Sequence, residues 1–480
     1  MTRTPADALA SPSELVDSTA SNLVALMKRG EASVVEVLEA HLARIDETNE
    51  RVNAIVALDP ERALENARQL DRAFTRDREE LPALYGLPMA HKDTLPVAGW
   101  VSTSGSTVHA NRVPAVDHIV VERERRAGAV TIGRTNVPEF GLGSHTFNPV
   151  YGQTHNPWNL ARSAGGSSGG AAAALTARML PIADGSDTGG SLRTPASFCN
   201  VVGLRPSVGT VPSWPDPTPW SRLSVKGPLA RTVRDLHLLL SVQAGEDPRF
   251  PGGRHVALGP LHHSPSIRSV RAGWSTDFGL GLPVEPEVRM ALGSVIETIA
   301  TAGAAITEEV PDLSGAPHAF SVLRAWQMEA TLGPIVDAHR EELGAAVVWN
   351  VELGRALSGP EVGAAELHSA VISERMRRYF TEYDFLLSPV VQVAPFDGRL
   401  DYPHEIDGVD MHDYLEWMTL PSTITMTGCP ALSLPVTFTT DGLPVGLQIV
   451  GPPGSEQGLL EFAAAVEEIF DVTGRLPSIA

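Results

Sequence analysis

The spacing of apolar residues near the N-terminus predicts consecutive helices. Leu23, Leu26 and Met27 fall on one helical face, and Gly30 stands where a glycine commonly ends a helix. Ser33, with Glu36 three residues later, forms a capping box that predicts the start of the next helix. After these helices the apolar run over 52–58 predicts a strand.

Between residues 81 and 206, short apolar runs alternate with clusters of Gly, Ser and Thr. The run over 129–132 predicts a strand, and 171–179 predicts a helix directly after a Gly/Ser loop. Such alternation is typical of α/β proteins, whose functional loops lie at strand ends. We expect the Pro- and Trp-rich stretch 208–228 to be a loop and 231–243 to be a helix.

Strands and helices are also predicted to alternate in the C-terminal half. Asp441-Gly442 separates two apolar runs and predicts the turn of a hairpin. The remaining elements we expect are helices over 60–74, 286–302 and 457–470, strands over 270–274 and 385–389, and hairpin strands over 432–438 and 445–450.

Composition narrows the class of protein further. Of the 480 residues 43% are hydrophobic, and the net charge is −20, which disfavours nucleic acid and anionic membranes as partners. The two cysteines, Cys199 and Cys429, provide neither a disulfide framework nor a zinc-binding spacing, so we expect no metal. No run of about 18 apolar residues predicts a membrane span, and the start lacks the apolar region of a signal peptide. We therefore expect a cytoplasmic enzyme.

The segment 164–170, Ala-Gly-Gly-Ser-Ser-Gly-Gly, precedes the helix expected from residue 171. A glycine-rich loop before a helix can bind phosphate, but no lysine follows this loop and its glycines do not fit GxGxxG. What the loop offers is two hydroxyls, Ser167 and Ser168, on a backbone that tolerates unusual dihedrals. A flexible turn without chemistry is the alternative interpretation.

A second glycine-rich segment ends at Ser191. The preceding glycines let several backbone N–H groups converge on one point, as an oxyanion requires, so Ser191 is a candidate nucleophile. The oxyanion hole that we expect consists of Thr188, Gly189 and Gly190. Asp187 can fix the loop by accepting backbone hydrogen bonds.

A serine nucleophile needs a base, and lysine is the more informative candidate. Five histidines lie upstream without an evident signature: His91, His109, His118, His145 and His155. Arginine serves as the cation almost everywhere, yet lysine is kept at Lys92, and only lysine can give up its proton to become a base. Lys226 is the competing lysine, and its setting predicts an exposed charge.

These segments together resemble the amidase signature family. The resemblance rests on 165–170 followed by 187–191, and on the spacing of these segments from Lys92. Further matching segments lie at 133–140, 151–158, 198–206 and 443–451, so the similarity covers nearly the whole chain. Two positions depart from the common pattern, with Ala164 where many members have Pro and Ala171 where many have Ser.

The resemblance implies a large mixed β-sheet flanked by α-helices on both sides, and a Ser–cis-Ser–Lys triad. Residue by residue, Ser191 would attack, Ser167 would relay the proton across a cis Gly166–Ser167 peptide, and Lys92 would be the terminal base. We expect one domain over 1–480, with N-terminal helices at about 15–75, a catalytic core at about 81–206 and helical elaborations of the substrate pocket at about 286–380.

The function implied is hydrolysis of small-molecule amides, with carbamates and esters as related substrates and no cofactor. The sequence does not determine the oligomeric state, and a homodimer is compatible with it. The alternative is the glutaminase subunit of a tRNA-dependent amidotransferase, against which Met418 stands where that subunit carries an acidic residue. A catalytically silent scaffold is a third interpretation, disfavoured by the intact Lys92, Ser167 and Ser191.

Five tryptophans are candidates for aromatic pocket walls, with core packing as the alternative: Trp214, Trp220, Trp326, Trp349 and Trp417.

Overall fold

Eight strands form the largest sheet of the computed structural model, which describes residues 11–73, 81–261 and 267–479. The strand order is β12-β11-β13-β17-β16-β9-β10-β8, in which β11 runs parallel to β12 and β13 while the other neighbours pair antiparallel. The strands are β8 (Ile182–Asp187), β9 (Val202–Arg205), β10 (Val225–Ala230), β11 (Arg271–Trp274), β12 (Ala305–Thr307), β13 (Phe385–Pro389), β16 (Ala431–Phe438) and β17 (Pro444–Val450). The fold is thus α/β with a mixed sheet, as the resemblance implies.

A smaller sheet carries the N-terminal part of the site. It has the order β1-β3-β2, from β1 (Ile55–Val56), β2 (Pro88–Lys92) and β3 (Val130–Thr135). Strand β2 lies beside β8, the edge strand of the large sheet, without pairing with it. The carboxyl ends of β2 and β8 therefore meet where the two sheets meet.

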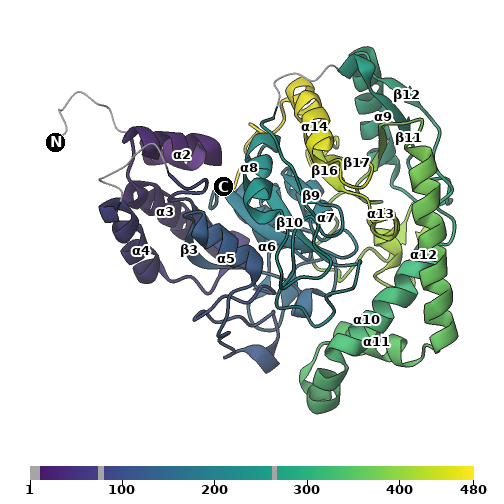
Figure 1. The fold of residues 1–480 in the computed structure, drawn as a ribbon, viewed down its shortest axis with the longest axis horizontal. Helices are drawn as coiled ribbons and strands as arrows, with labels where there is room; N and C mark the ends of the chain where they lie inside the picture. Colours follow the sequence, from purple (N-terminus) through teal and green to yellow (C-terminus); the bar gives the residue numbers. More distant parts are fainter. Residues whose placement is uncertain (1–10, 74–80, 262–266, 480) are drawn as a thin grey trace.

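Helices surround both sheets (Figure 1). The N-terminal helices α1 (Pro12–Asp17), α2 (Ala20–Arg29), α3 (Val34–Val52) and α4 (Pro60–Ala73) lie on the side of the small sheet. Helices α8 (Val233–Gln243) and α14 (Glu456–Phe470) pack on each other and on the large sheet, as do α6 (Gly169–Thr176) and α7 (Arg193–Cys199). Two further helices are α5 (Ile119–Arg126) and α9 (Pro286–Thr301).

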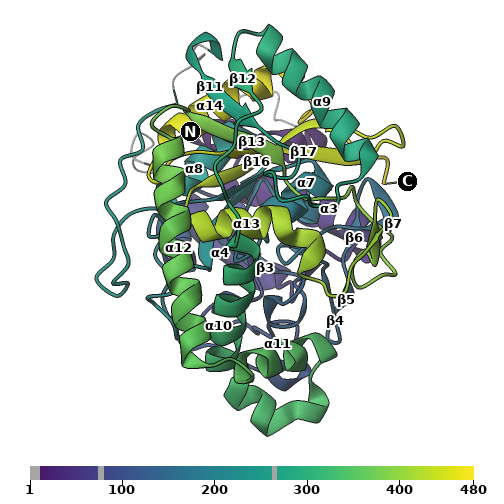
Figure 2. The same ribbon diagram turned by 90° about the vertical axis from the view of Figure 1, so that its right-hand side faces the viewer.

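Three helices, two of them long, form an arm beside the large sheet. Helix α10 (Ala316–His339) packs against α11 (Ala345–Arg355) and α12 (Gly359–Tyr379), and α13 (Thr419–Thr427) contacts both α10 and α12. Figure 2 shows this arm facing the viewer, with α13 crossing between it and the strands. No helix in the described ranges has the length and apolar character needed to cross a bilayer.

Local capping chemistry determines several of these boundaries. Gly30 ends α2 in the left-handed region at φ 73°, and the Ser33–Glu36 capping box starts α3. The predicted hairpin is confirmed as β16 and β17, with Gly442 at φ 79° in the turn. The helix expected over 60–74 is α4, and residue 74 lies outside the described residues.

Two expectations about the strands are wrong. The strand expected over 52–58 shrinks to Ile55–Val56, because α3 continues to Val52 and Asn53 then ends it in the left-handed region. The stretch 208–228 is not all loop, since β10 begins at Val225 and pairs with both β8 and β9. The local sequence does not predict this strand because it contains Gly227 and Pro228, and both residue types are uncommon in strand interiors.

Candidate active site

Lys92 is the last residue of β2, and all five residues of that strand are buried. Its amino group lies among three hydroxyl groups, 2.8 Å from Ser167 Oγ, 2.9 Å from Ser168 Oγ and 2.9 Å from Ser186 Oγ. Three hydroxyl neighbours satisfy either form of the amine, since the ammonium has three N–H donors and the neutral amine has two N–H donors and one lone pair. Ser186 is a contact that the sequence did not suggest.

The loop before α6 presents Ser167 to the lysine. The Gly166–Ser167 peptide is cis, and Thr146 Oγ1 fixes the loop by donating to Gly165 O at 2.8 Å and accepting from Gly169 N at 3.2 Å. Every residue of α6 is buried, and a side chain at Gly170 would collide with the backbone of Asn136. The small residues after the loop therefore let the helix start deep in the protein, beside Lys92.

The turn that follows β8 is organised by the Asp187 carboxylate, as expected. Asp187 accepts hydrogen bonds from Gly190 N at 2.9 Å and Leu192 N at 3.2 Å. The side chains of Arg193 and Arg205 pair with it at 2.9 and 3.2 Å, and all three groups are fully buried. Burial opposes ionisation of Asp187, but the two guanidinium groups outweigh it and hold the pKa far below its usual range.

This arrangement changes the expected oxyanion hole. The Gly190 N–H already donates to Asp187, so it is turned away from a substrate oxygen. Thr188 and Gly189 line the cleft together with Ser191, which is 8% exposed. The N–H groups that we then expect to face a substrate are those of Thr188, Gly189 and Ser191.

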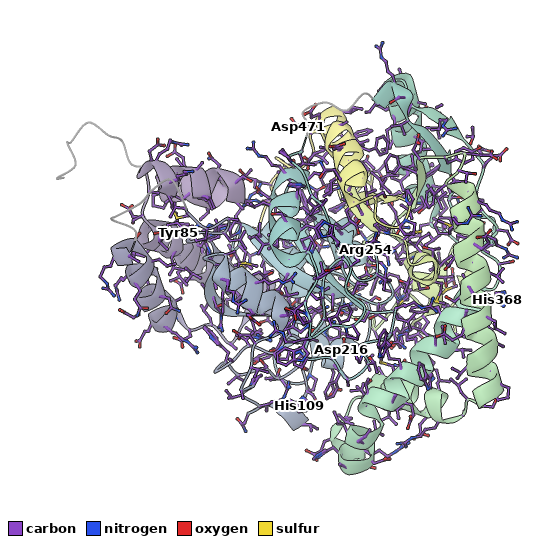
Figure 3. All side chains as sticks on the ribbon, in the orientation of Figure 1. Tyr85, His109, Asp216, Arg254, His368 and Asp471 are labelled. Carbon is purple, nitrogen blue, oxygen red and sulfur yellow. The ribbon has the colours of Figure 1, made fainter. Side chains whose placement is uncertain are left out.

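Ser167 and Ser191 face the same cleft, of about 650 Å³. Their loops are joined by a hydrogen bond from Ser168 N to Ser191 O at 3.2 Å. Within residues 11–73, 81–261 and 267–479, no hydrogen bond joins the two side-chain oxygens directly. The structure therefore brings the buried Lys92 onto Ser167, and Ser167 opens into the cleft that Ser191 also lines. Asp216, labelled in Figure 3, lines the same cleft.

Lys92 has the electrostatic setting of a base. Burial, together with the positive charge of Lys226, lowers its pKa to about 7 against the opposing effect of Asp187 and Asp184. The prediction that Lys226 is an exposed charge is wrong. Lys226 lies on β10 opposite Ser186 of β8, it lines the cleft, and burial lowers its pKa as well.

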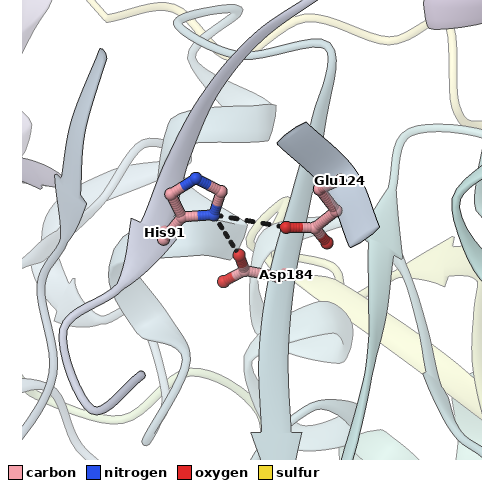
Figure 4. Close-up of side chains that lie close together, drawn as sticks. All are labelled: His91, Glu124 and Asp184. Carbon is pink, nitrogen blue, oxygen red and sulfur yellow. Dashed lines mark hydrogen bonds and ion pairs between the residues drawn. The ribbon is translucent and has the colours of Figure 1, made fainter. Parts of the chain in front are cut away.

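Behind Lys92 lies a buried cluster of His91, Glu124 and Asp184, shown in Figure 4. His91 Nδ1 is 2.6 Å from Asp184 Oδ2 and 3.3 Å from Glu124 Oε2, and none of the three side chains is exposed. Asp184 Oδ1 accepts the backbone N–H of Lys92 at 2.7 Å. The cluster therefore contacts the candidate base through the backbone.

These three residues have the donor types of a metal site, but their geometry is that of a hydrogen-bonded cluster. Metal-bound nitrogen and oxygen atoms each lie about 2 Å from the ion, and 2.6 Å between His91 and Asp184 is a direct hydrogen bond. Burial lowers the pKa of His91, but the carboxylates outweigh that effect and raise it. Burial and the charge of Asp184 raise the pKa of Glu124 to about 7.

The sequence motifs did not identify Asp184 or Glu124 as functional residues. The available signal was limited to Asp184, an acidic residue directly after the apolar Ile182 and Ala183, since Glu124 stands between two arginines in α5. Among the five candidate histidines, His118 lines the cleft, where burial puts its pKa well below the usual value and Nδ1 accepts from Val120 N. A histidine held in this way is a poor proton acceptor.

The aromatic candidates fall outside the cleft. None of the five tryptophans lines it within the described residues. Trp417 is fully buried and stacks on Phe198 at 6.2 Å, while Trp220 and Trp326 line a separate apolar pocket of about 410 Å³. The cleft walls come instead from loop residues 140–144 and from one face of α10.

Comparison with known proteins gives consistent similarities. The family model Amidase matches residues 36–460. The chain is 34% identical to a glutamyl-tRNA(Gln) amidotransferase subunit of Salinispora tropica, covering 95% of this chain and 98% of that protein. It is also 34% identical to an acylamidase of Rhodococcus erythropolis, covering 94% and 95%.

Solved structures agree in fold. A bacterial aryl acylamidase of the amidase signature enzymes superposes with a TM-score of 0.87 at 27% identity, covering 96% of this chain and 99% of that one. A 6-aminohexanoate cyclic dimer hydrolase bound to its substrate superposes with a TM-score of 0.85 at 25% identity, covering 97% and 99%. The fold described above thus has counterparts among enzymes that act on C–N bonds.

Proposed function

Because the chain belongs to the amidase signature family, we propose that it hydrolyses small-molecule amides through an acyl-enzyme formed on Ser191. The observation that carries this proposal is a buried lysine whose pKa lies near 7 and whose amine is 2.8 Å from Ser167, in the cleft that Ser191 shares. Such a lysine is uncharged often enough near neutral pH to take a proton.

In the first step Lys92 accepts the proton of Ser167, and Ser167 takes the proton of Ser191. The Ser191 oxygen then forms a bond to the substrate carbonyl carbon. Rotation of the Ser191 side chain brings its hydroxyl to Ser167, since both line one cleft. Backbone N–H groups of Thr188, Gly189 and Ser191 stabilise the oxyanion, and Asp187 holds their turn in shape by accepting from Gly190 N and Leu192 N.

The tetrahedral intermediate then loses its amine. The C–N bond breaks, and the nitrogen receives the proton returned from Lys92 through Ser167. A water molecule attacks the resulting ester, passing its proton along the same relay, and the acid leaves with Ser191 regenerated. Carbamates and esters form the same kind of intermediate, so the proposed machinery also extends to them.

The alternative is the glutaminase component of a tRNA-dependent amidotransferase, because relatives named as amidotransferase subunits are equally similar in sequence. One observation favours the small-molecule hydrolase. Met418 lines the cleft and receives a hydrogen bond from Ser144 Oγ at 3.0 Å, so a thioether stands where an acidic residue would hold the glutamine amine. The cleft therefore offers no carboxylate from that position.

A hydrolysis panel tests the proposal. The purified protein is assayed with 4-nitroanilides, primary amides, aryl carbamates and esters, and with L-glutamine for release of ammonia, with Ser191→Ala as the blank. We expect turnover of one or more small-molecule classes by the isolated chain. Glutamine hydrolysis that appears only after addition of the other amidotransferase components would instead support the alternative.

A further inference from the structure

Arg324 places a positive charge in the cleft wall without a carboxylate beside it. The residue is 5% exposed and lines the cleft from α10. Its guanidinium donates to Asn350 Oδ1 and to Tyr414 OH, both neutral. Within 11–73, 81–261 and 267–479, no carboxylate oxygen approaches it to 4.0 Å.

Most of the other buried arginines in the described part of the chain pair with carboxylates, but Arg231, which is 3% exposed, donates instead to the backbone carbonyls of Val16 and Ser18. The three arginines that are fully buried pair with carboxylates, Arg134 with Asp93 at 3.1 Å and both Arg193 and Arg205 with Asp187. A buried charge is costly unless it is paired. Arg324 differs from Arg231 because it lines the cleft, where two neutral side chains hold its guanidinium and its charge faces whatever enters.

Arg324 lies near the turn that is expected to bind the carbonyl oxygen of the substrate. Phe320 lies one helical turn earlier on α10, and a β-carbon added to Gly189 would lie 2.8 Å from its ring. Residues i and i+4 share a helical face and lie about 6 Å apart along the axis. The guanidinium is thus a short distance along the cleft from the turn that would hold the oxyanion.

The charge of the cleft lining is opposite in sign to the net charge of the protein. Its described lining residues include Arg112, Lys226 and Arg324 against one carboxylate, Asp216. That carboxylate is engaged by Ser213 Oγ and by Thr218 N, each at 2.8 Å. In a chain of net charge −20, a cationic concavity attracts anions from solution.

We propose that the cleft takes an amide that carries a carboxylate, and that Arg324 binds this carboxylate through paired N–H donors. The inference rests on the proposed hydrolase function and narrows its substrate class. Guanidinium and carboxylate match in shape and form two parallel hydrogen bonds, which a neutral group cannot reproduce. Asn350 and Tyr414 act as positioning residues that hold the guanidinium.

The carboxylate can belong to either side of the scissile bond, so the test uses two matched pairs of substrates. Glutaric acid mono-4-nitroanilide is compared with pentanoic acid 4-nitroanilide, and 4-acetamidobenzoate is compared with acetanilide. In the wild type we expect kcat/KM for one charged substrate to exceed that of its neutral counterpart by about 10-fold or more. The pair that shows the preference identifies the side that carries the charge.

Substitution of the arginine should remove that preference. Arg324→Gln should lower the charged-to-neutral ratio of kcat/KM by about 10-fold or more, and Arg324→Lys should restore part of it. Arg340→Gln is the matched control, because Arg340 is an exposed arginine that pairs with Glu352 at 2.6 Å outside the cleft. Thermal melts of all variants separate loss of the charge from loss of the fold.

A binding measurement keeps this inference independent of the proposed reaction. Calorimetry on Ser191→Ala uses glutarate monoamide and 4-acetamidobenzoate, which carry the carboxylate on opposite sides of the amide. At least one of them should bind, with an affinity that falls about 10-fold or more in the Ser191→Ala/Arg324→Gln double variant. Equal affinity for the two proteins, or an unchanged charged-to-neutral ratio in Arg324→Gln, would overturn the carboxylate site while leaving the hydrolase standing. Binding without turnover of any substrate would instead reject the proposed reaction and keep the site.

Discussion

The carboxylate of Asp184 accepts the backbone N–H of Lys92 at 2.7 Å, and this bond joins the two sheets at the site. Lys92 ends β2 of the small sheet, and Asp184 belongs to β8 at the edge of the large one. The other oxygen of Asp184 is 2.6 Å from His91 Nδ1. One carboxylate thus sets the strand that carries the proposed base against the strand that leads to Ser191.

Asp184→Asn should therefore impair turnover more than substrate binding. The amide retains one acceptor oxygen but presents N–H groups to the second partner, so either Lys92 N or His91 loses its acceptor. We expect kcat to fall by about 10-fold or more with KM changed less, because the lysine moves and not the cleft wall. Steady-state kinetics with a thermal melt checks this. A variant with wild-type kcat would show that the carboxylate does not position the lysine.

Removal of the reacting groups should abolish the reaction. Ser191→Ala and Lys92→Ala should each lower kcat by about 10³-fold or more, and the double variant should be little worse, because the residues act as one unit. Lys92→Arg should be as inactive as Lys92→Ala, since arginine keeps the charge but cannot become a base. The exposed Ser294 on α9 provides a control, and Ser294→Ala should retain full activity. Substantial turnover by Lys92→Arg would rule out a lysine base.

The pH dependence of the reaction should report the ionisation of Lys92. Its pKa is lowered to about 7, and only the uncharged amine accepts a proton, so kcat/KM should be low at acidic pH and rise to a plateau above about pH 7. Lys226→Met removes the neighbouring positive charge that contributes to the lowering. The acidic limb of that variant should therefore move to higher pH. A profile that is flat from about pH 5 to 9 would contradict the assignment.

The turn that follows β8 depends on a single buried carboxylate. Asp187→Asn leaves the guanidinium groups of Arg193 and Arg205 buried without a counter-ion, and loss of one partner of a buried pair costs about 3–5 kcal/mol. The same change weakens the acceptor of Gly190 N and Leu192 N. We expect a marked fall in melting temperature together with loss of kcat. Unchanged stability would show that the charges of this network are compensated in another way.

How much of this molecule the sequence predicts depends on the distance over which each signal acts. The ends of α2 and α3 are predicted because Gly30 and the Ser33–Glu36 box act within one turn. Strand β10 is missed because Gly227 and Pro228 disfavour it locally, and only pairing with β8 and β9 makes it a strand. Local patterns therefore predict boundaries better than they predict sheet membership.

The residues of the site fall into the same two groups: those that local motifs predict and those that only the fold brings together. Lys92, Ser167 and Ser191 stand in recognisable motifs, and their proximity follows from the resemblance. The contact between His91 and Asp184 joins residues 93 positions apart, and neither this contact nor the place of Lys226 in the cleft lining can be predicted from neighbouring residues. Arg324 is one arginine among many in the sequence, and only the fold shows that it lines the cleft without a carboxylate partner among the described residues.

Glu124 should make the stability of the protein depend on pH. Burial and the charge of Asp184 raise its pKa from 4.5 to about 7, so the fold favours its protonated form. The stabilisation from this group is complete below about pH 4.5 and is lost as the pH rises through about 7. Glu124→Gln keeps an acceptor for the Gln243 amide, 2.8 Å away, but has no proton to lose. The variant should therefore gain stability relative to the wild type as the pH rises, by roughly 1–3 kcal/mol.

The measurement is the difference in melting temperature between Glu124→Gln and the wild type at about pH 5 and about pH 8. Using a difference removes the contributions of groups common to both proteins, including Glu467, whose pKa burial also raises to about 7. Glu341→Gln makes the same substitution at an exposed position and should give an equal difference at both pH values. If Glu124→Gln behaved like Glu341→Gln, or lost stability relative to the wild type at the higher pH, Glu124 would have to be ionised throughout this range. The cluster behind Lys92 would then hold two charged carboxylates around His91, and His91 would have to carry the compensating positive charge.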